Sequence, residues 1–114
     1  MKTKYHEEPP ASSWIRDLKQ SGAQETGLFV FMRYSKADIK TARVAIIVSR
    51  KIGNSVVRNK IKRRLREIFR KCMREALAPG YYLLIARTAI VKVDFGHLQE
   101  DILELVEKLS RDKK

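Results

Sequence analysis

The sequence is poor in several residue types, and each shortage narrows what the protein can be. Its 114 residues include one cysteine, Cys72, which excludes a disulfide framework and a cysteine-based zinc site. No apolar run approaches the roughly 18 residues that suggest a membrane-spanning helix. The first ten residues also lack the apolar stretch of a signal peptide. We therefore expect a soluble, cytoplasmic protein without a membrane partner.

Acidic residues are scarce as well, because 13 Asp plus Glu stand against 25 Lys plus Arg, a net charge of +12. The excess is concentrated in residues 50–74, which carry eleven basic side chains and one acidic side chain, Glu67. A charge concentrated in this way forms a patch that attracts a polyanion. At 44% hydrophobic residues, the chain can still build the core of one domain.

Hydrophobic patterning predicts an α+β fold, a small α/β sandwich with helices packed on a central mixed sheet. Residues 1–11 are predicted to form a flexible polar arm, and residues 12–114 a single domain. The expected order is helix, strand, strand, an optional further strand, helix, strand, helix. The predicted strands cover residues 28–34, 43–49 and 81–87. The predicted helices cover residues 12–22, residues 56–77 and the segment after Asp94. We expect Asn54 or Ser55 to cap the second helix and Asp94 to cap the third.

The central helix has one apolar stripe and two basic rows. The stripe consists of Val57, Ile61, Leu65, Ile68 and Cys72, with Phe69 at its edge. The first row consists of Arg58, Lys62, Arg66 and Arg70. A second row beside it consists of Asn59 and Arg63. Three further basic residues point farther away: Lys60, Arg64 and Lys71. Like charges four residues apart repel by about 0.2–0.5 kcal/mol per pair, so the rows are better explained by an external anion than by helix stability.

Several alternatives compete with an RNA partner. A solvated basic face, a calmodulin-target helix and a membrane-surface helix are all possible for such a segment. The helix lies between two strong strands and has few acidic partners, which favours RNA, because Arg and Asn suit phosphates, 2′-hydroxyls and base edges. A duplex DNA partner remains open. The sequence predicts no metal site and no catalytic residue on the protein alone. This holds for the two histidines, His6 and His97, and for the carboxylates of the last helix.

The sequence of residues 51–67, KIGNSVVRNKIKRRLRE, closely resembles the signature of the bacterial ribonuclease P protein subunit. The pattern is Arg-Asn-x-x-Lys-Arg-x-x-Arg on a helix, preceded by Lys-x-Gly-Asn, and the order of elements extends the resemblance over roughly residues 12–110. The resemblance implies a monomer that pairs one-to-one with a large catalytic RNA. The complex would remove the 5′ leader of precursor tRNA with magnesium ions held mainly by the RNA and the substrate, and the isolated protein would be inactive. It also implies a left-handed crossover around the central helix. A ribosomal-type structural RNA-binding protein is the alternative.

Carried over residue by residue, the resemblance implies two surfaces. The surface for the catalytic RNA comprises Lys51, Arg58, Asn59, Lys62, Arg63 and Arg66, to which the basic row adds Arg70. The surface for the single-stranded leader comprises Trp14, Leu18, Val30, Met32, Ser49 and Arg50. An aromatic floor with a cationic rim suits a single strand, because any base can stack on it. For Trp14 and Leu18 the alternative is that they attach the first helix to the core.

Overall fold

A five-stranded mixed sheet with the order β1-β4-β5-β3-β2 forms the centre of the computed structural model. Its strands are β1 (Lys4–Glu8), β2 (Ala23–Thr26), β3 (Val30–Ser35), β4 (Thr41–Ile47) and β5 (Gly80–Ala86). β4 runs parallel to β1 and β5, whereas β3 runs antiparallel to β2 and β5. The structure describes residues 4–8, 14, 15, 18, 23–36, 40–71 and 79–111. The predicted α+β architecture with a mixed sheet is confirmed.

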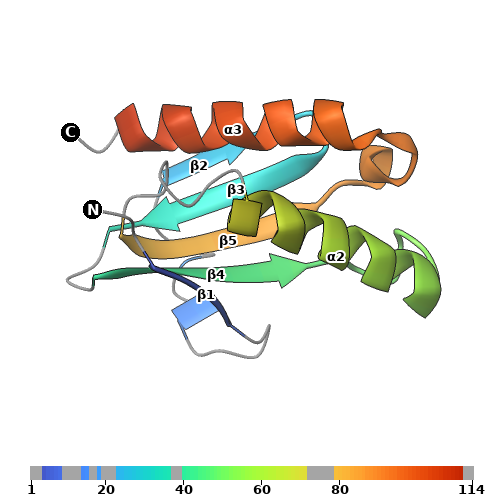
Figure 1. Cartoon of the computed structure of the whole chain (residues 1–114), viewed down its shortest axis with the longest axis horizontal. Helices are drawn as coiled ribbons and strands as arrows, with labels where there is room; N and C mark the ends of the chain where they lie inside the picture. Colours follow the sequence, from blue (N-terminus) through green and yellow to red (C-terminus); the bar gives the residue numbers. More distant parts are fainter. Residues whose placement is uncertain are drawn as a thin grey trace.

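Two long helices, α2 (Ser55–Lys71) and α3 (Phe95–Arg111), cover one face of this sheet. Figure 1 shows α2 beside β4 and β5, and α3 beside β2 and β3, which agrees with their contacts. The short 3₁₀ helix η1 (Thr88–Lys92) leads from β5 into α3. The main core lies in this layer and contains Ile61, Leu65, Ile68 and Phe69 of α2 and Leu98, Ile102, Leu105, Val106 and Leu109 of α3. Phe69, which was expected at the edge of the apolar stripe, is fully buried.

The opposite face of the sheet carries a smaller apolar cluster. Trp14, Ile15 and Leu18 are helical, and they pack there against Ala45 and Leu83. Apolar side chains therefore pack on the second face as well, as expected for a sheet whose strands are apolar on both faces. The strands β4 and β5 are parallel neighbours joined through α2. That this crossover is left-handed stays a prediction made from the resemblance.

The N-terminal segment differs from the prediction. A flexible polar arm was expected over residues 1–11, but Lys4–Glu8 form β1 and pair in parallel register with Thr41–Ala45 of β4. The prediction is wrong for these five residues because Lys and Glu are depleted in strands and give no β signal. The open edge of β4 supplies the hydrogen-bonding partner instead. The optional further strand was expected between the second predicted strand and the central helix, but the additional strand, β2, lies before the first predicted strand instead.

The entry into β5 is held by close packing at Gly80. Its φ of 145° is unfavourable for side chains, and an added Cβ would lie 2.6 Å from Cε1 of Tyr34. The Tyr34 hydroxyl donates a hydrogen bond to the Pro79 carbonyl over 2.8 Å, and burial raises the pKa of this tyrosine. The predicted break at Pro79-Gly80 thus coincides with the start of β5. The last six predicted residues of the central helix, with Cys72 among them, lie outside the described part of the chain.

Candidate nucleic-acid interface

The basic helix α2 starts from a tight turn. The N–H of Ile52 donates to the Ser49 carbonyl over 3.1 Å, which closes the turn. The side-chain oxygen of Asn54 accepts the N–H of Val57 over 3.0 Å, so Asn54 rather than Ser55 caps the helix. Ser49, Arg50 and Lys51 are exposed on this turn. All three therefore remain accessible to a ligand at the start of α2, as their predicted roles require.

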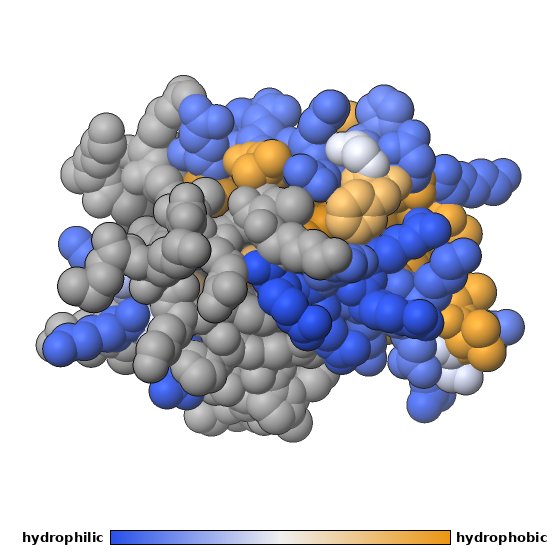
Figure 2. Space-filling view, viewed as in Figure 1, coloured by the Kyte–Doolittle hydropathy of each residue, from blue (hydrophilic) through white to orange (hydrophobic). Residues whose placement is uncertain are grey.

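The polar side of α2 faces outward while its apolar stripe is buried. Asn59, Arg63 and Arg70 are exposed, whereas Arg58, Lys62 and Arg66 are half-buried. Figure 2 shows strongly hydrophilic side chains gathered in the band that α2 occupies in Figure 1. The structure thus brings together six of the seven residues predicted for the catalytic RNA on one helix, with Lys51 on the adjoining turn.

Two details show that this basic surface is partly ordered by the protein itself. The Nε–H of Arg58 donates to the Gly53 carbonyl over 3.2 Å, which holds its guanidinium beside the turn. Farther along α2, a hollow of about 320 Å³ is lined by Arg63, Arg66, Glu67 and Arg70. Three arginines around one carboxylate leave a local excess of positive charge. Arginine forks of this kind recognise phosphate oxygens in pairs.

Arg64 belongs to a different environment. Its Nη1 donates to the carbonyl of Val93 over 3.4 Å, at the residue that follows η1. Helical periodicity had already separated Arg64 from the basic rows, although it could not identify this partner. Arg64 therefore braces the connection between β5 and α3, and its charge is directed away from the outward surface of α2.

The second sheet face is the other part of the interface, and it is aromatic. The rings of Trp14 and Tyr81 lie 4.8 Å apart between centroids and are tilted by 36°. Both residues are half-buried, and they pack at the border of the cluster that contains Ile15, Leu18 and Leu83. A single-stranded nucleic acid needs accessible ring faces of this type for base stacking.

Two of the residues predicted for the leader do not lie on this surface. Val30 and Met32 have no exposed area, and they belong to the main core under α2 and α3. These two assignments are wrong because a shift of one residue along a strand moves a side chain to the other face. Leu18 lies on the second face but is 3% exposed, so it packs the first helix against the sheet, which is the alternative role considered for it.

The residues that occupy the second face were missed in the sequence. They are Phe31 and Arg33 of β3, Arg43 of β4, and Tyr81 of β5 with Arg87 just beyond it. Arg33 Nη1 donates to the Leu18 carbonyl over 3.3 Å, and Arg87 lies over the Phe31 ring at 4.9 Å. The alternation of Arg33 and Arg43 with apolar neighbours is the only sequence signal for this face.

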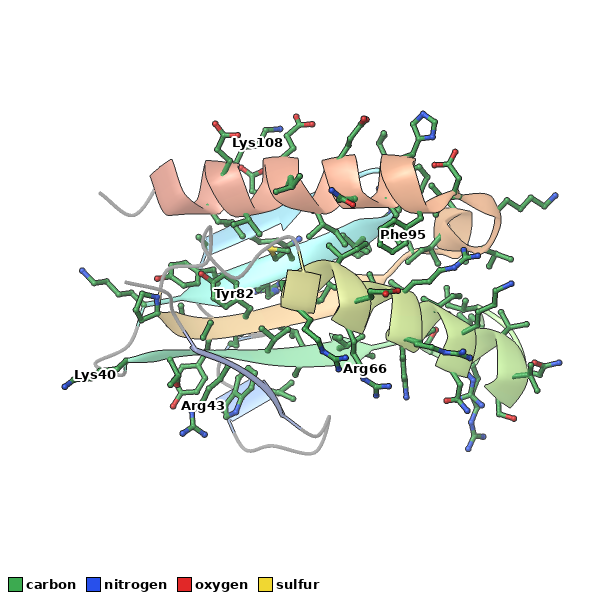
Figure 3. All side chains as sticks on the ribbon, viewed as in Figure 1. Lys40, Arg43, Arg66, Tyr82, Phe95 and Lys108 are labelled. Atoms are coloured by element: carbon green, nitrogen blue, oxygen red, sulfur yellow. The ribbon has the colours of Figure 1, made fainter. Side chains whose placement is uncertain are left out.

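The two parts of the interface meet at one edge of the sheet. Figure 3 shows Arg66 extending from α2 toward β4, the strand next to the edge strand β1, and Arg43 also extends from β4. Arg43 is the register partner of Tyr81, so it connects this edge to the aromatic surface. The arrangement can therefore contact a polyanion on α2 and an unpaired strand on the second face at the same time.

Two other features, a metal site and a membrane-spanning helix, are absent from the described ranges of the chain. Within residues 4–8, 14, 15, 18, 23–36, 40–71 and 79–111, no three His, Cys, Asp or Glu residues are placed to hold a metal ion. Over the same ranges no helix has the length and apolar character needed to span a membrane. The carboxylate on α2, Glu67, lies among arginines, which is a poor environment for a divalent cation.

Comparison with known proteins identifies relatives of one kind. The ribonuclease P family model matches residues 11–110. The ribonuclease P protein component of Thermus aquaticus is 39% identical over 89 residues, which cover 78% of this chain and 52% of that protein. The corresponding component of Caldanaerobacter subterraneus subsp. tengcongensis is 38% identical over 95 residues, which cover 82% of this chain and 81% of that protein. This chain spans about half the length of the Thermus relative.

Solved structures give the same result for the fold. The ribonuclease P protein of Thermotoga maritima superimposes with a TM-score of 0.76 at 27% identity, covering 82% of this chain and 89% of that one. A mutant ribonuclease P protein of Staphylococcus aureus superimposes with a TM-score of 0.78 at 25% identity, covering 87% and 85%. Because the family match extends over nearly the whole sequence and these folds agree, the chain belongs to the ribonuclease P protein family.

Proposed function

We propose that this chain is the protein subunit of ribonuclease P, which binds the catalytic RNA and the 5′ leader of precursor tRNA. The observation that carries the proposal is the outward basic surface of α2, which bears the family signature and has Glu67 as the one acidic residue in its sequence. A surface of this kind binds the phosphate backbone of RNA through its charge and its rigid helical shape. Family membership identifies which RNA it would bind.

The catalytic RNA would contact the side chains of α2 and the turn before it. The proposed contacts are Lys51, Arg58, Asn59, Lys62, Arg63, Arg66 and Arg70. The arginines would bind phosphates through paired donors, and Asn59 would offer a donor and an acceptor together to a base edge or a 2′-hydroxyl. Arg58 is held in place by its bond to the Gly53 carbonyl, which lowers the entropy lost on binding.

The leader would lie on the second sheet face, away from the predicted residues Val30 and Met32, which belong to the main core. Trp14 and Tyr81 would offer stacking surfaces, and Arg33 and Arg43 would offer positive charge on the same face. Ser49 and Arg50 stay in the proposal because they are exposed where β4 leads into α2. Stacking on aromatic rings tolerates any base, so this surface would hold leaders of different sequence.

The chemistry of leader removal would belong to the RNA. Magnesium ions would be held mainly by the RNA and the substrate, and the basic surface of α2 would help to order the RNA that binds them. On its own the protein would cleave nothing. We further propose that it works in the cytoplasm as a monomer in a one-to-one complex with the catalytic RNA.

Binding measurements at matched salt test this assignment. The dissociation constant is measured for the cognate catalytic RNA, for a ribosomal RNA fragment of equal length, and for duplex DNA. The proposal predicts the tightest binding to the catalytic RNA. Equal or tighter binding to ribosomal RNA would assign the same helix to a structural RNA-binding protein instead, and preference for duplex DNA would contradict both.

A further inference from the structure

The strand β1 lies outside the part of the chain that the family model matches. The family match begins at residue 11, whereas β1 ends at Glu8. β1 pairs along the outer edge of β4, from Lys4 beside Thr41 to Glu8 beside Ala45. Residues outside the family match therefore cover this edge of β4.

The covered edge lies between the two surfaces of the proposed interface. His6 is the register partner of Arg43, and Arg43 is in turn the partner of Tyr81, whose ring contacts Trp14. On the other face α2 packs beside β4, and Arg66 extends from α2 toward this edge (Figure 3). An RNA strand that passes from α2 to Trp14 over this edge would have to cross β1.

Several features make the pairing of β1 weak. The strand has five residues and lies at the end of the sheet, so β4 is its one neighbouring strand in the described sheet. Lys and Glu are disfavoured in strands, and parallel pairing is slightly less stable per residue than antiparallel pairing. The chain continues with Pro9-Pro10, which have no N–H to donate to a ladder. Short edge segments of this type open at low cost.

The charge of the segment opposes RNA at this position. Residues 4–8 carry Lys4 against Glu7 and Glu8, in a molecule whose neighbouring segment 50–74 is strongly basic. The register places Glu7 beside Val44 and Glu8 beside Ala45, toward the end of β4 that leads to the basic turn. A polyanion that crosses here meets like charge, which disfavours the complex as long as β1 stays paired.

Resting on the proposed function, we propose that β1 is an autoinhibitory strand. It covers the edge of β4 in the free protein, and it leaves this edge when the leader passes from the catalytic RNA on α2 to the second sheet face. The coupling is reciprocal: the pairing of β1 weakens leader binding, and a bound leader loosens β1. Mature tRNA has no leader to place on this face, so displacement of β1 favours leader-bearing tRNA over mature tRNA.

A reversible lock tests this inference in the full chain. Lys4→Cys and Thr41→Cys are introduced together with Cys72→Ser, because paired strands lie about 4.8 Å apart and a disulfide spans Cα atoms about 4.4–6.8 Å apart. The complex of this variant with the cognate catalytic RNA is prepared in oxidised and in reduced form. The dissociation constants for precursor tRNA with its leader and for mature tRNA without one are then measured. Each single-cysteine variant, treated with the same oxidant, serves as a control.

The expected result is leader-specific. The oxidised complex should bind precursor tRNA at least about fivefold more weakly than the reduced complex, the lower end of typical coupling, and both should bind mature tRNA equally. Equal affinity of the two forms for precursor tRNA, or tighter binding by the oxidised form, would overturn the inference and leave the proposed function intact. If the reduced form neither binds the catalytic RNA nor assists it, the proposed function itself fails, and the inference with it.

Discussion

The carboxylate of Asp101 on α3 lies directly against Gly27, where an added Cβ would be 2.6 Å from its Oδ2. The close approach lets the two carboxylate oxygens accept the N–H groups of Leu28 and Phe29, over 3.0 Å and 2.9 Å. Asp101 is 7% exposed, and it thus joins α3 to the β2–β3 turn. Because these residues are 72 and 73 positions apart in the sequence, the contact ties the C-terminal helix to the start of the sheet.

Replacing Asp101 with alanine should destabilise the fold. Two backbone donors would lose their acceptors, and an unsatisfied buried group costs about 1–3 kcal/mol. Urea unfolding monitored by circular dichroism measures the loss. Glu100→Ala serves as the control, because Glu100 is exposed on the same helix and its loss should change stability by less than about 0.5 kcal/mol. Equal stability of the two variants would show that the Asp101 contact contributes nothing.

The contact between Asp94 and His97 should make stability depend on pH. The backbone N–H and the ring of His97 both bond to the Asp94 carboxylate, over 2.8 Å and 2.6 Å. The backbone bond and the ring bond hold the pKa of Asp94 below its ordinary 3.8, and the ring bond raises the pKa of His97 above 6.5. The Asp94 contribution is present above 3.8 and fades as pH falls through its folded pKa. The His97 contribution is present below 6.5 and fades as pH rises through its folded pKa.

NMR titration of the imidazole tests this directly, with thermal unfolding at several pH values alongside it. We expect the pKa of His97 to lie above its ordinary value, and stability to decline as pH rises through it. In His97→Gln this decline should disappear, while the cap from the Asp94 side chain to the backbone remains. A pKa of His97 at or below 6.5 would contradict the prediction.

Arg63 and Arg64 are neighbours in sequence with different expected roles. Arg63 is exposed on the outward surface of α2, whereas Arg64 bonds to the Val93 carbonyl. Arg63→Ala should weaken binding to the catalytic RNA and lower the salt slope by about 0.7–0.9, as for one phosphate contact. Arg64→Ala should cost stability, about 0.5–1.5 kcal/mol for one hydrogen bond, with a smaller effect on the slope. Titrations at four salt concentrations measure both, and a reversed pattern would refute the assignment.

Trp14 and Leu18 should likewise separate leader binding from folding. Leu18 is buried, so Leu18→Ala should lower stability by about 2–5 kcal/mol. Trp14 is half-buried beside Tyr81, and Trp14→Leu keeps an apolar side chain while removing the aromatic face. This variant should bind the catalytic RNA normally but lose preference for tRNA with a leader. The ratio of dissociation constants with and without the leader measures this, and an unchanged ratio would argue against stacking on Trp14.

The helices were the most predictable part of the structure. The cap at Asn54, the stripe of α2 and the cap at Asp94 depend on local spacing, and each is present as expected. The three predicted strands were also found, with boundaries shifted by two residues or fewer, because apolar runs bounded by turns are typical of central strands. Local sequence carries these features, so no knowledge of the tertiary structure was needed.

What the sequence left undetermined depends on tertiary contacts. In β3 an almost continuous apolar run hides which residues face α3, so Val30 and Met32 were assigned to the wrong side. β1 has no β propensity of its own and exists because the edge of β4 accepts it. The outward surface of α2 was predictable because charge and periodicity agree there. The second sheet face was not, since its members come from three strands brought together by pairing.

The most direct test of the proposed function is cleavage of precursor tRNA by the cognate catalytic RNA at low magnesium, with and without this protein. We expect the protein alone to cleave nothing and the RNA alone to cleave slowly. Adding the protein in a one-to-one ratio should accelerate release of the leader, and Arg58→Ala combined with Arg63→Ala should abolish most of that gain. If added protein leaves the cleavage rate unchanged at every magnesium concentration, this chain is not the functional partner of that RNA.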